Sequence, residues 1–169
     1  MSVPLSPPEP LAEHHELDSF ASGEPALDDW LRRRARANQS SGASRTYVVC
    51  EGKRVAGYYA LASGAISQST VPGRFRRNMP DPIPVVVLAP LAADRTHQGH
   101  GLGRALFREA ARRVAQAAGT IGIPGIVVHA ISEDARRFYL ALGFDPCPAE
   151  AMTLVATVQD LRAALNQIS

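Results

Sequence analysis

The sequence predicts a mixed α/β fold in which helices pack on a single sheet. A hairpin is expected first, because two runs of β-branched and aromatic residues, 46–50 and 55–61, flank the turn residues 51–54. Two buried strands are expected next, an apolar run at 85–89 and a second run at 125–130, and they alternate with segments of helical periodicity. The chain is therefore expected to pass from a helix through strands in a meander to alternating strands and helices.

Composition indicates one domain. The 169 residues are 46% hydrophobic and 20% charged, which suits a compact core with little disorder. We expect a flexible proline-rich arm at residues 1–10 and a single domain over residues 11–169. The net charge of +2 is small, but the grouped arginines leave room for an anionic partner.

The cysteines, Cys50 and Cys147, have neither the spacing of a metal site nor that of a disulfide framework. We expect two free thiols in a reducing cytoplasm, and no metal. The N-terminal sequence lacks the basic start and apolar stretch of a signal peptide, and no apolar run is long enough to span a bilayer. The sequence therefore predicts a cytoplasmic protein that is not attached to a membrane.

Ahead of the hairpin, residues 26–39 are expected to form an amphipathic helix. Leu27, Trp30 and Leu31 recur at helical spacing and form its apolar side. Another side of the helix is basic and carries Arg32, Arg33 and Arg36. Such a face can follow a nucleic-acid backbone, although most charged helix faces are simply solvated.

Beyond the hairpin, a third strand is expected around residues 63–70. The next segment, residues 71–84, holds four prolines and predicts a surface loop, because neither a helix nor a strand ladder tolerates that proline density. The loop is basic through Arg74, Arg76 and Arg77, which are further candidates for contact with a polyanion.

Helical periodicity is strongest over residues 102–118, which follow the first apolar run. Ser132 is expected to cap the next helix at its N-terminus, and Gly143 to end it. Residues 151–156 predict a late strand, and Thr157 opens a last amphipathic helix.

A glycine-rich turn lies between the strand at 85–89 and the helix at 102–118. Glycines at 99, 101 and 103 are expected to take positive φ and to let an anion approach the unpaired amides of the helix N-terminus. Arg104 follows the third glycine where a Walker A loop needs lysine and where a dinucleotide fingerprint prefers glycine, so both of those loops are disfavoured. The turn alone leaves a plain loop and a phosphate site as open alternatives.

The turn Gln98–Gly103 resembles the Gln/Arg-x-x-Gly-x-Gly pyrophosphate loop of the GNAT superfamily of acetyl-CoA-dependent N-acetyltransferases. Residues 135–144, Ala-Arg-Arg-Phe-Tyr-Leu-Ala-Leu-Gly-Phe, are similar to the family's tyrosine-bearing helix that ends in Gly-Phe. The resemblance implies the GNAT fold, with mostly antiparallel N-terminal strands, a splayed parallel central pair and helices on both faces.

The resemblance extends over residues 11–168 to the GNAT toxins of bacterial type II toxin–antitoxin modules, through the segments 20–23, 44–49, 57–61 and 83–88. It implies an enzyme that acetylates the α-amino group of aminoacyl-tRNA and stops translation. It also implies a ribbon-helix-helix antitoxin as partner and a homodimer.

Family roles can be carried over residue by residue. Leu91 and Ala93 would contact the pantetheine arm of acetyl-CoA through their backbone, and Tyr139 would act as general acid. The pyrophosphate cradle would consist of Gln98, Gly99, His100, Gly101, Leu102, Gly103 and Arg104. A phenol suits its role, because it is protonated at neutral pH and can deliver a proton to the leaving thiolate.

No general base stands out from the sequence. His97, His100 and His129 are candidates, but the first two lie in or beside the turn, and a lone histidine in a strand is more often structural. An α-amino group is partly neutral at pH 7 and needs a base less than a lysine does. Pro90 stands where the related toxins usually have arginine, so a substrate contact of that arginine is in doubt.

Two alternatives remain open. One is an acetyltransferase with the same cofactor but a small amine or a protein amine as acceptor. The other is a non-catalytic module that binds CoA or the antitoxin. The arginine-rich segments flanking the site argue against polyamines, which need an acidic cleft.

Overall fold

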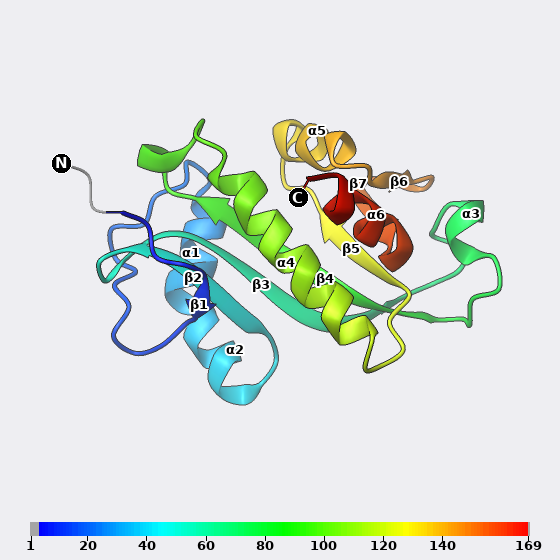
Figure 1. Ribbon diagram of the computed structural model, residues 1–169, viewed down its shortest axis with the longest axis horizontal. Helices are drawn as coiled ribbons and strands as arrows, with labels where there is room; N and C mark the ends of the chain where they lie inside the picture. Colours follow the sequence, from blue (N-terminus) through cyan, green and yellow to red (C-terminus); the bar gives the residue numbers. More distant parts are fainter. Residues whose placement is uncertain (1–3, 169) are drawn as a thin grey trace. The chain divides into compact units, whose positions relative to one another are not determined.

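The computed structural model describes residues 4–168 and contains a seven-stranded sheet with the order β1-β2-β3-β4-β5-β7-β6 (Figure 1). Its first strands pair antiparallel and β4 pairs parallel with β5, so the predicted mixed sheet with a parallel central pair is confirmed. The chain divides into two compact units, described separately below. Unit 1 comprises Met1–Ala62 and Ala89–Ala110, and unit 2 comprises Ser63–Leu88 and Ala111–Ser169.

Unit 1 contains the N-terminal helices and strands. Its elements are β1 (Glu9–Pro10), α1 (Pro25–Arg33), α2 (Ala35–Ser41), β2 (Arg45–Glu51) and the 3₁₀ helix η1 (Arg95–His97). Three elements belong to both units, namely β3 (Arg54–Ile66), β4 (Ile83–Ala93) and α4 (Leu102–Ala118).

The predicted helix over residues 26–39 is two helices that meet at Arg34. Arg34 has φ −115° and ψ −34°, which ends α1 and starts α2 although its N–H still donates to the carbonyl oxygen of Trp30. Leu31 and Ala35, on either side of the break, are both fully buried. Trp30 stacks on Tyr58 of β3 with ring centroids 5.9 Å apart, so the apolar side of the helix packs on the sheet as predicted.

Residues 5–10 lie along β2, and this differs from the flexible arm that we expected. Glu9 pairs with Val48 in β1, and the N–H of Ser6 donates to the carbonyl oxygen of Cys50 at 2.8 Å. Proline is tolerated here because β1 is at the edge of the sheet, where one side needs no ladder hydrogen bond. Residues 1–3 of the expected arm lie outside the described residues.

The strands of the first half are longer than predicted. β3 runs through Arg54–Ile66 and merges the expected strand at 55–61 with much of the separate third strand expected at 63–70, which is therefore wrong. β4 likewise extends the predicted run at 85–89 to Ile83–Ala93 and includes Pro90. The parallel pairing of β4 with β5 ends at Leu88, so Pro90 interrupts no pair of that ladder.

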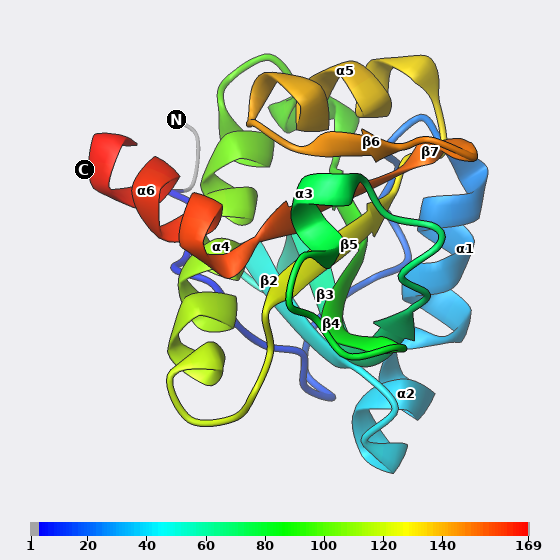
Figure 2. The ribbon, with the colours of Figure 1, turned by 90° about the vertical axis from the view of Figure 1, so that its right-hand side faces the viewer.

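Unit 2 contains the elements of the second half. They are α3 (Gly73–Arg76), β5 (Gly125–His129), α5 (Glu133–Ala141), β6 (Asp145–Cys147), β7 (Glu150–Thr157) and α6 (Val158–Ile168). The turn of helix α3 differs from the plain loop that we predicted over residues 71–84, and Figure 2 shows it over β5 and β7. Phe75 anchors it in a buried cluster with Val127 and Val155.

Glycine at position 125 makes the α3 contact possible. A Cβ atom there would lie 2.4 Å from the ring of Phe75, which is closer than real Cβ contacts allow. Gly125 thus accommodates the aromatic anchor at the start of a strand whose next three residues are β-branched.

Several local predictions are confirmed. The helix predicted over 102–118 has the bounds of α4. Ser132 caps α5 by accepting the N–H of Ala135 at 3.1 Å, and Gly143 follows the helix with φ +102°.

Cys50 and Cys147 are buried free thiols, and burial raises the pKa of Cys50 to about 11. None of the helices within residues 4–168 is both long and apolar enough to cross a bilayer.

Candidate active site

The glycine-rich turn of unit 1 is open on its outer side. Gly99 and Gly101 both have φ +82°, and a Cβ atom at either position would meet nothing within 4 Å. Positive φ is therefore confirmed at these two glycines. It is wrong for Gly103, which lies inside α4 with helical backbone. The space over the turn is free for a ligand, while the backbone shape depends on the first two glycines.

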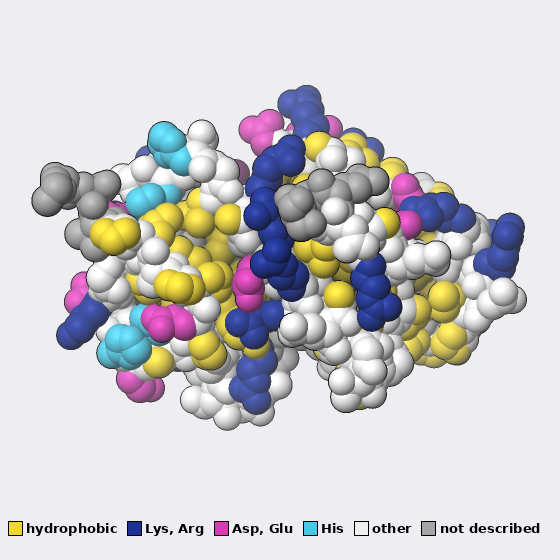
Figure 3. All heavy atoms as spheres, in the orientation of Figure 1, with side chains coloured by type: hydrophobic (Ala, Val, Ile, Leu, Met, Phe, Trp, Pro, Cys, Tyr) yellow, Lys and Arg dark blue, Asp and Glu magenta, His cyan; other side chains and the backbone are white. Residues whose placement is uncertain are grey.

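The N-terminus of α4 begins directly at this turn. Gly101 accepts the N–H of Ala105 at 3.0 Å, so the amides of residues 102–104 precede the first helical hydrogen bond. Unpaired amides and the helix dipole together favour an anion such as a phosphate oxygen. Arg104 is exposed and Arg108 lies one turn further on, and Figure 3 shows Lys and Arg side chains gathered where α4 runs in Figure 1.

Two side chains tie the turn to the segment that leads into α1. Gln98 donates its amide N–H groups to the carbonyl oxygens of Ser22, at 2.6 Å, and Ala93, at 2.9 Å. Asp94 accepts the N–H of Ala21 at 2.8 Å. The Gln98 amide thus holds the turn in place. The sequence had suggested only that Gln98 belongs to the pyrophosphate cradle.

Asp94 is a residue of this region that the sequence reasoning missed. It is buried and also accepts the N–H and hydroxyl of Thr96, as the N-cap of η1. Burial by itself would raise the pKa of Asp94, but the hydrogen bonds from Thr96 and Ala21 and the charge of Arg54 lower it below its usual value. An aspartate directly after a strand and two residues before threonine is the signal that would have identified it.

Leu91 and Ala93, the expected backbone partners of the pantetheine arm, lie at the end of β4 and are half-buried. The carbonyl oxygen of Ala93 already accepts from Gln98. Contact of these two residues with a cofactor stays a prediction.

Tyr139 lies on α5 in unit 2 and is only 6% exposed. Its ring makes edge contacts with Phe138 and Phe144, at centroid distances of 5.2 and 5.5 Å. Burial raises the pKa of the Tyr139 phenol above its ordinary value, so the group keeps its proton at neutral pH. The aromatic contacts hold the ring in one orientation, as a proton donor requires.

Two arginines of the first helices are used to hold the N-terminal segment. Arg32 donates to the carbonyl oxygen of Phe20 at 2.8 Å. Arg36, now on α2, donates to the carbonyl oxygen of His15 at 2.5 Å. Both predicted RNA contacts therefore have internal partners.

In the proline-rich segment, one predicted arginine has internal partners and two do not. Arg74 forms ion pairs with Asp145 at 2.6 Å and Asp160 at 2.7 Å, which tie α3 to β6 and α6. The remaining arginines of the predicted set are exposed, and their guanidinium groups have no partner among residues 4–168: Arg33, Arg76 and Arg77.

The three histidines considered as bases have different surroundings. His97 pairs with Glu51 at 2.5 Å and is partly buried, whereas His100 is exposed in the turn. His129 ends β5, is exposed, and has Nδ1 3.2 Å from the hydroxyl oxygen of Thr153.

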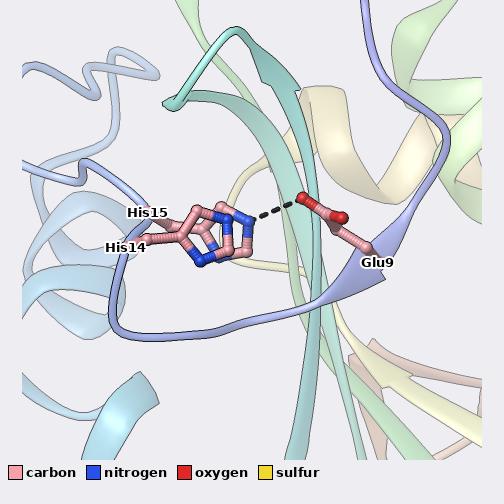
Figure 4. A group of neighbouring side chains, drawn as sticks. All are labelled: Glu9, His14 and His15. Carbon is pink, nitrogen blue, oxygen red and sulfur yellow. Dashed lines mark hydrogen bonds and ion pairs between the residues drawn. The ribbon is translucent and has the colours of Figure 1, made fainter.

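A cluster of Glu9, His14 and His15 was not expected from the sequence and has ligand atoms close enough together for a metal ion (Figure 4). The hydrogen bonds favour a structural role instead. His15 accepts the N–H of Ala12 on Nδ1 at 2.9 Å, so its neutral ring carries the proton on Nε2, which lies 2.7 Å from the Glu9 carboxylate. No lone pair of His15 is left for a metal.

Comparison with known proteins gives relatives over nearly the whole chain. The chain is 48% identical over 161 residues to the tRNA-acetylating toxin of Mycobacterium tuberculosis, which covers 95% of this chain and 97% of that protein. The structure of AtaT complexed with acetyl-methionyl-tRNAfMet matches with a TM-score of 0.86 at 29% identity, covering 95% of this chain and 98% of that one.

A tyrosine-to-phenylalanine variant of AtaT, bound to the C-terminus of the antitoxin AtaR and to acetyl-CoA, matches with a TM-score of 0.83 at 29% identity, over 97% of this chain and 99% of that one. The acetyltransferase (GNAT) family model matches residues 11–144, which include the glycine-rich turn and Tyr139. The chain therefore belongs to the GNAT family of acetyltransferases.

Proposed function

We propose that the protein is a toxin that acetylates the α-amino group of aminoacyl-tRNA and thereby blocks translation. The observation that carries this proposal is the 48% identity, over almost the whole of both chains, to a tRNA-acetylating toxin. Support also comes from AtaT, a structural relative that forms a complex with acetyl-methionyl-tRNAfMet. An N-acetylated aminoacyl group has lost the nucleophile that peptide-bond formation needs.

Acetyl-CoA is the acetyl donor in this proposal. The positive-φ glycines Gly99 and Gly101 and the amides of residues 102–104 would bind its pyrophosphate, with Arg104 adding positive charge. Gln98 would act by holding the turn rather than by touching the phosphates. The backbone of Leu91 and Ala93 would receive the pantetheine arm.

The acceptor amine would attack the thioester carbonyl directly in a ternary complex. As the N–C bond forms and the C–S bond breaks, the leaving thiolate takes the proton of the Tyr139 phenol. The raised pKa of Tyr139 means that the phenol holds its proton before the reaction starts. The low-polarity surroundings that raise this pKa also favour a neutral thiol over a thiolate.

Fewer arginines contact the tRNA backbone in this proposal than in the prediction from sequence. Arg33, Arg76 and Arg77 are the exposed members without an internal partner among the described residues, and they would meet phosphates. Arg32, Arg36 and Arg74 would support the elements that present them.

The proposed toxin function also implies a location, a protein partner and an oligomeric state. A tRNA substrate places the protein in the cytoplasm. AtaT binds the C-terminus of an antitoxin, AtaR, and we propose a ribbon-helix-helix antitoxin and a homodimer for this chain as well. Residues 11–169 would act as one acetyltransferase domain, of which the family model covers 11–144.

The proposal is tested by incubating the protein with radiolabelled acetyl-CoA and total aminoacyl-tRNA. The matched control is the same tRNA pool after mild deacylation, and parallel reactions contain spermidine or a peptide with a free N-terminus. We expect label on charged tRNA alone. Label on the peptide or the polyamine but not on tRNA would show that aminoacyl-tRNA is not the acceptor. No label on any acceptor would favour the non-catalytic module.

A further inference from the structure

His129 ends β5 at the carboxyl end of a parallel strand pair. β4 and β5 pair parallel from Val85 with Gly125 to Leu88 with Val128, and His129 is the next residue. Ligands of α/β proteins bind at the carboxyl ends of such strands. Val127, two residues earlier and thus on the same face, is buried, whereas the imidazole of His129 is exposed.

A chain of hydrogen bonds fixes which nitrogen of this imidazole carries the proton. His129 and Thr153 are cross-strand partners in β5 and β7, and the Thr153 hydroxyl donates to the Glu150 carboxylate at 3.1 Å. A carboxylate can only accept, so the hydroxyl proton points to Glu150. The Thr153 oxygen must then accept from Nδ1 of His129, 3.2 Å away.

In the neutral tautomer that this arrangement selects, the lone pair of the imidazole lies on Nε2. Among residues 4–168, Nε2 of His129 has no hydrogen-bond partner. The ring of His129 is exposed, so this nitrogen is open to solvent or to a ligand. The sequence favoured a structural role because the link through Thr153 to Glu150 is not visible in one strand alone.

Charged side chains are present on β7, which pairs with the strand of His129, and on α5, which is hydrogen-bonded to β7. Glu150 acts on the His129 ring through Thr153. Arg136 of α5 is tied to the neighbouring strand by donating Nε to the carbonyl oxygen of Ala151 at 2.9 Å, and it pairs with Glu133 at 3.5 Å.

We propose that His129 is the general base of the acetyl transfer, and this rests on the function proposed above. An amine that attacks a carbonyl becomes cationic even when it starts neutral, so one proton must leave the nitrogen. Nε2 of His129 takes that proton, while the leaving sulfur takes the proton of Tyr139. The N–C bond forms, the C–S bond breaks, and exchange with solvent returns both side chains to their starting states.

The activity test compares His129→Ala with the wild type on aminoacyl-tRNA. We expect kcat to fall by about a hundredfold or more and the KM for acetyl-CoA to stay unchanged. Added imidazole is expected to restore part of the rate. An unchanged kcat in a folded His129→Ala protein would overturn the proposal.

Thr153 supplies a second variant that keeps the imidazole. Thr153 is a positioning residue here, and Thr153→Val removes the hydroxyl while it preserves the shape of the side chain. We expect a kcat loss of about tenfold, and Thr153→Ser is expected to recover most of it. Equal losses in the valine and serine variants would show that the hydroxyl does not act through His129.

A readout without any substrate separates this proposal from the proposed function. The ¹⁵N NMR signals of His129 should show the Nδ1–H tautomer in the wild type and a shift toward Nε2–H in Thr153→Val. A wild type with the Nε2–H tautomer would overturn the proposal even if tRNA is acetylated. A wild type that leaves tRNA unlabelled would contradict the proposed function. The tautomer would still decide whether His129 presents a free lone pair.

Discussion

The turn at residues 98–104 is exposed and offers backbone amides, whereas Tyr139 on α5 is buried and offers a single phenol. The shape of the turn depends on the positive φ of Gly99 and Gly101. The phenol depends on the aromatic ring contacts and the burial around it. A site built from backbone is damaged by changes in conformation, and a site built from a side chain is damaged by the loss of one atom.

The largest effect is expected where one atom carries the chemistry. Tyr139→Phe keeps the ring against Phe144 and removes only the hydroxyl. We expect kcat to fall by about 10²- to 10⁴-fold, with the affinity for acetyl-CoA, measured by calorimetry, unchanged.

The matched control is Tyr58→Phe, which removes another buried hydroxyl, one that donates to the carbonyl oxygen of Leu27. It should lower the free energy of unfolding by about 1 kcal/mol and leave kcat as it is. Near-normal turnover in Tyr139→Phe would remove this residue from the mechanism.

A conformational change in the turn should act on binding instead. Gly101→Ala places a side chain at φ +82°, where nothing clashes but the backbone is strained. The strain of about 1–3 kcal/mol should appear as weaker binding of acetyl-CoA, by about tenfold, while kcat at saturation is kept.

Gly52→Ala tests whether strain alone explains such a result. Gly52 also has positive φ, +62°, with nothing within 4 Å, but it lies in the hairpin between β2 and β3. This variant should lose a similar amount of stability and bind acetyl-CoA normally. Equal weakening of binding in both variants would contradict the assignment of the turn.

The arginines without internal partners should matter for the nucleic acid alone. Replacing Arg76 and Arg77 together by alanine is expected to raise the KM for aminoacyl-tRNA several-fold. The salt dependence of log KM should weaken by about one unit of slope for each lost phosphate contact. Arg32→Ala is the control, because its guanidinium already donates to Phe20. An unchanged salt slope in the double variant would show that α3 does not touch tRNA.

The last effect is expected on stability rather than on activity, and it depends on pH. The pKa of Asp94 is lowered in the folded state, so the carboxylate stabilises the fold at neutral pH, and this contribution is lost as the pH falls through the folded-state pKa. Asp94→Asn should therefore lose about 1–3 kcal/mol at pH 7 and differ less from the wild type below about pH 4. Urea titrations at both pH values measure this, and a pH-independent difference would contradict it.

The sequence correctly predicted features that depend on neighbouring residues alone, such as helix bounds and helix caps. The bounds of α4 and the cap at Ser132 follow from periodicity and from one side chain. The strand β1 could not be predicted, because a two-residue segment gains its structure only by pairing with β2. The break at Arg34 and the merging of β3 depend likewise on packing that no short window contains.

The candidate site divides in the same way. Glycines before a helix and a tyrosine before Gly-Phe are motifs of adjacent residues, and they led to the turn and to Tyr139. Asp94 and the Glu150–Thr153–His129 chain depend on contacts between segments far apart in sequence, as in the hydrogen bond from Ala21 to Asp94. The contacts that these side chains make with distant segments were therefore the part that the sequence could not reveal, although a local signal marks Asp94 itself.

The central claim, acetyl transfer to the α-amine of aminoacyl-tRNA, is tested most directly by identifying the product. Charged tRNA is treated with the wild type and acetyl-CoA, digested with nuclease, and the aminoacyl-adenosine is analysed by mass spectrometry. We predict one acetyl group on the α-nitrogen, absent when Tyr139→Phe replaces the wild type. An acetyl group on a side chain, or unmodified aminoacyl-adenosine beside consumed acetyl-CoA, would contradict this claim.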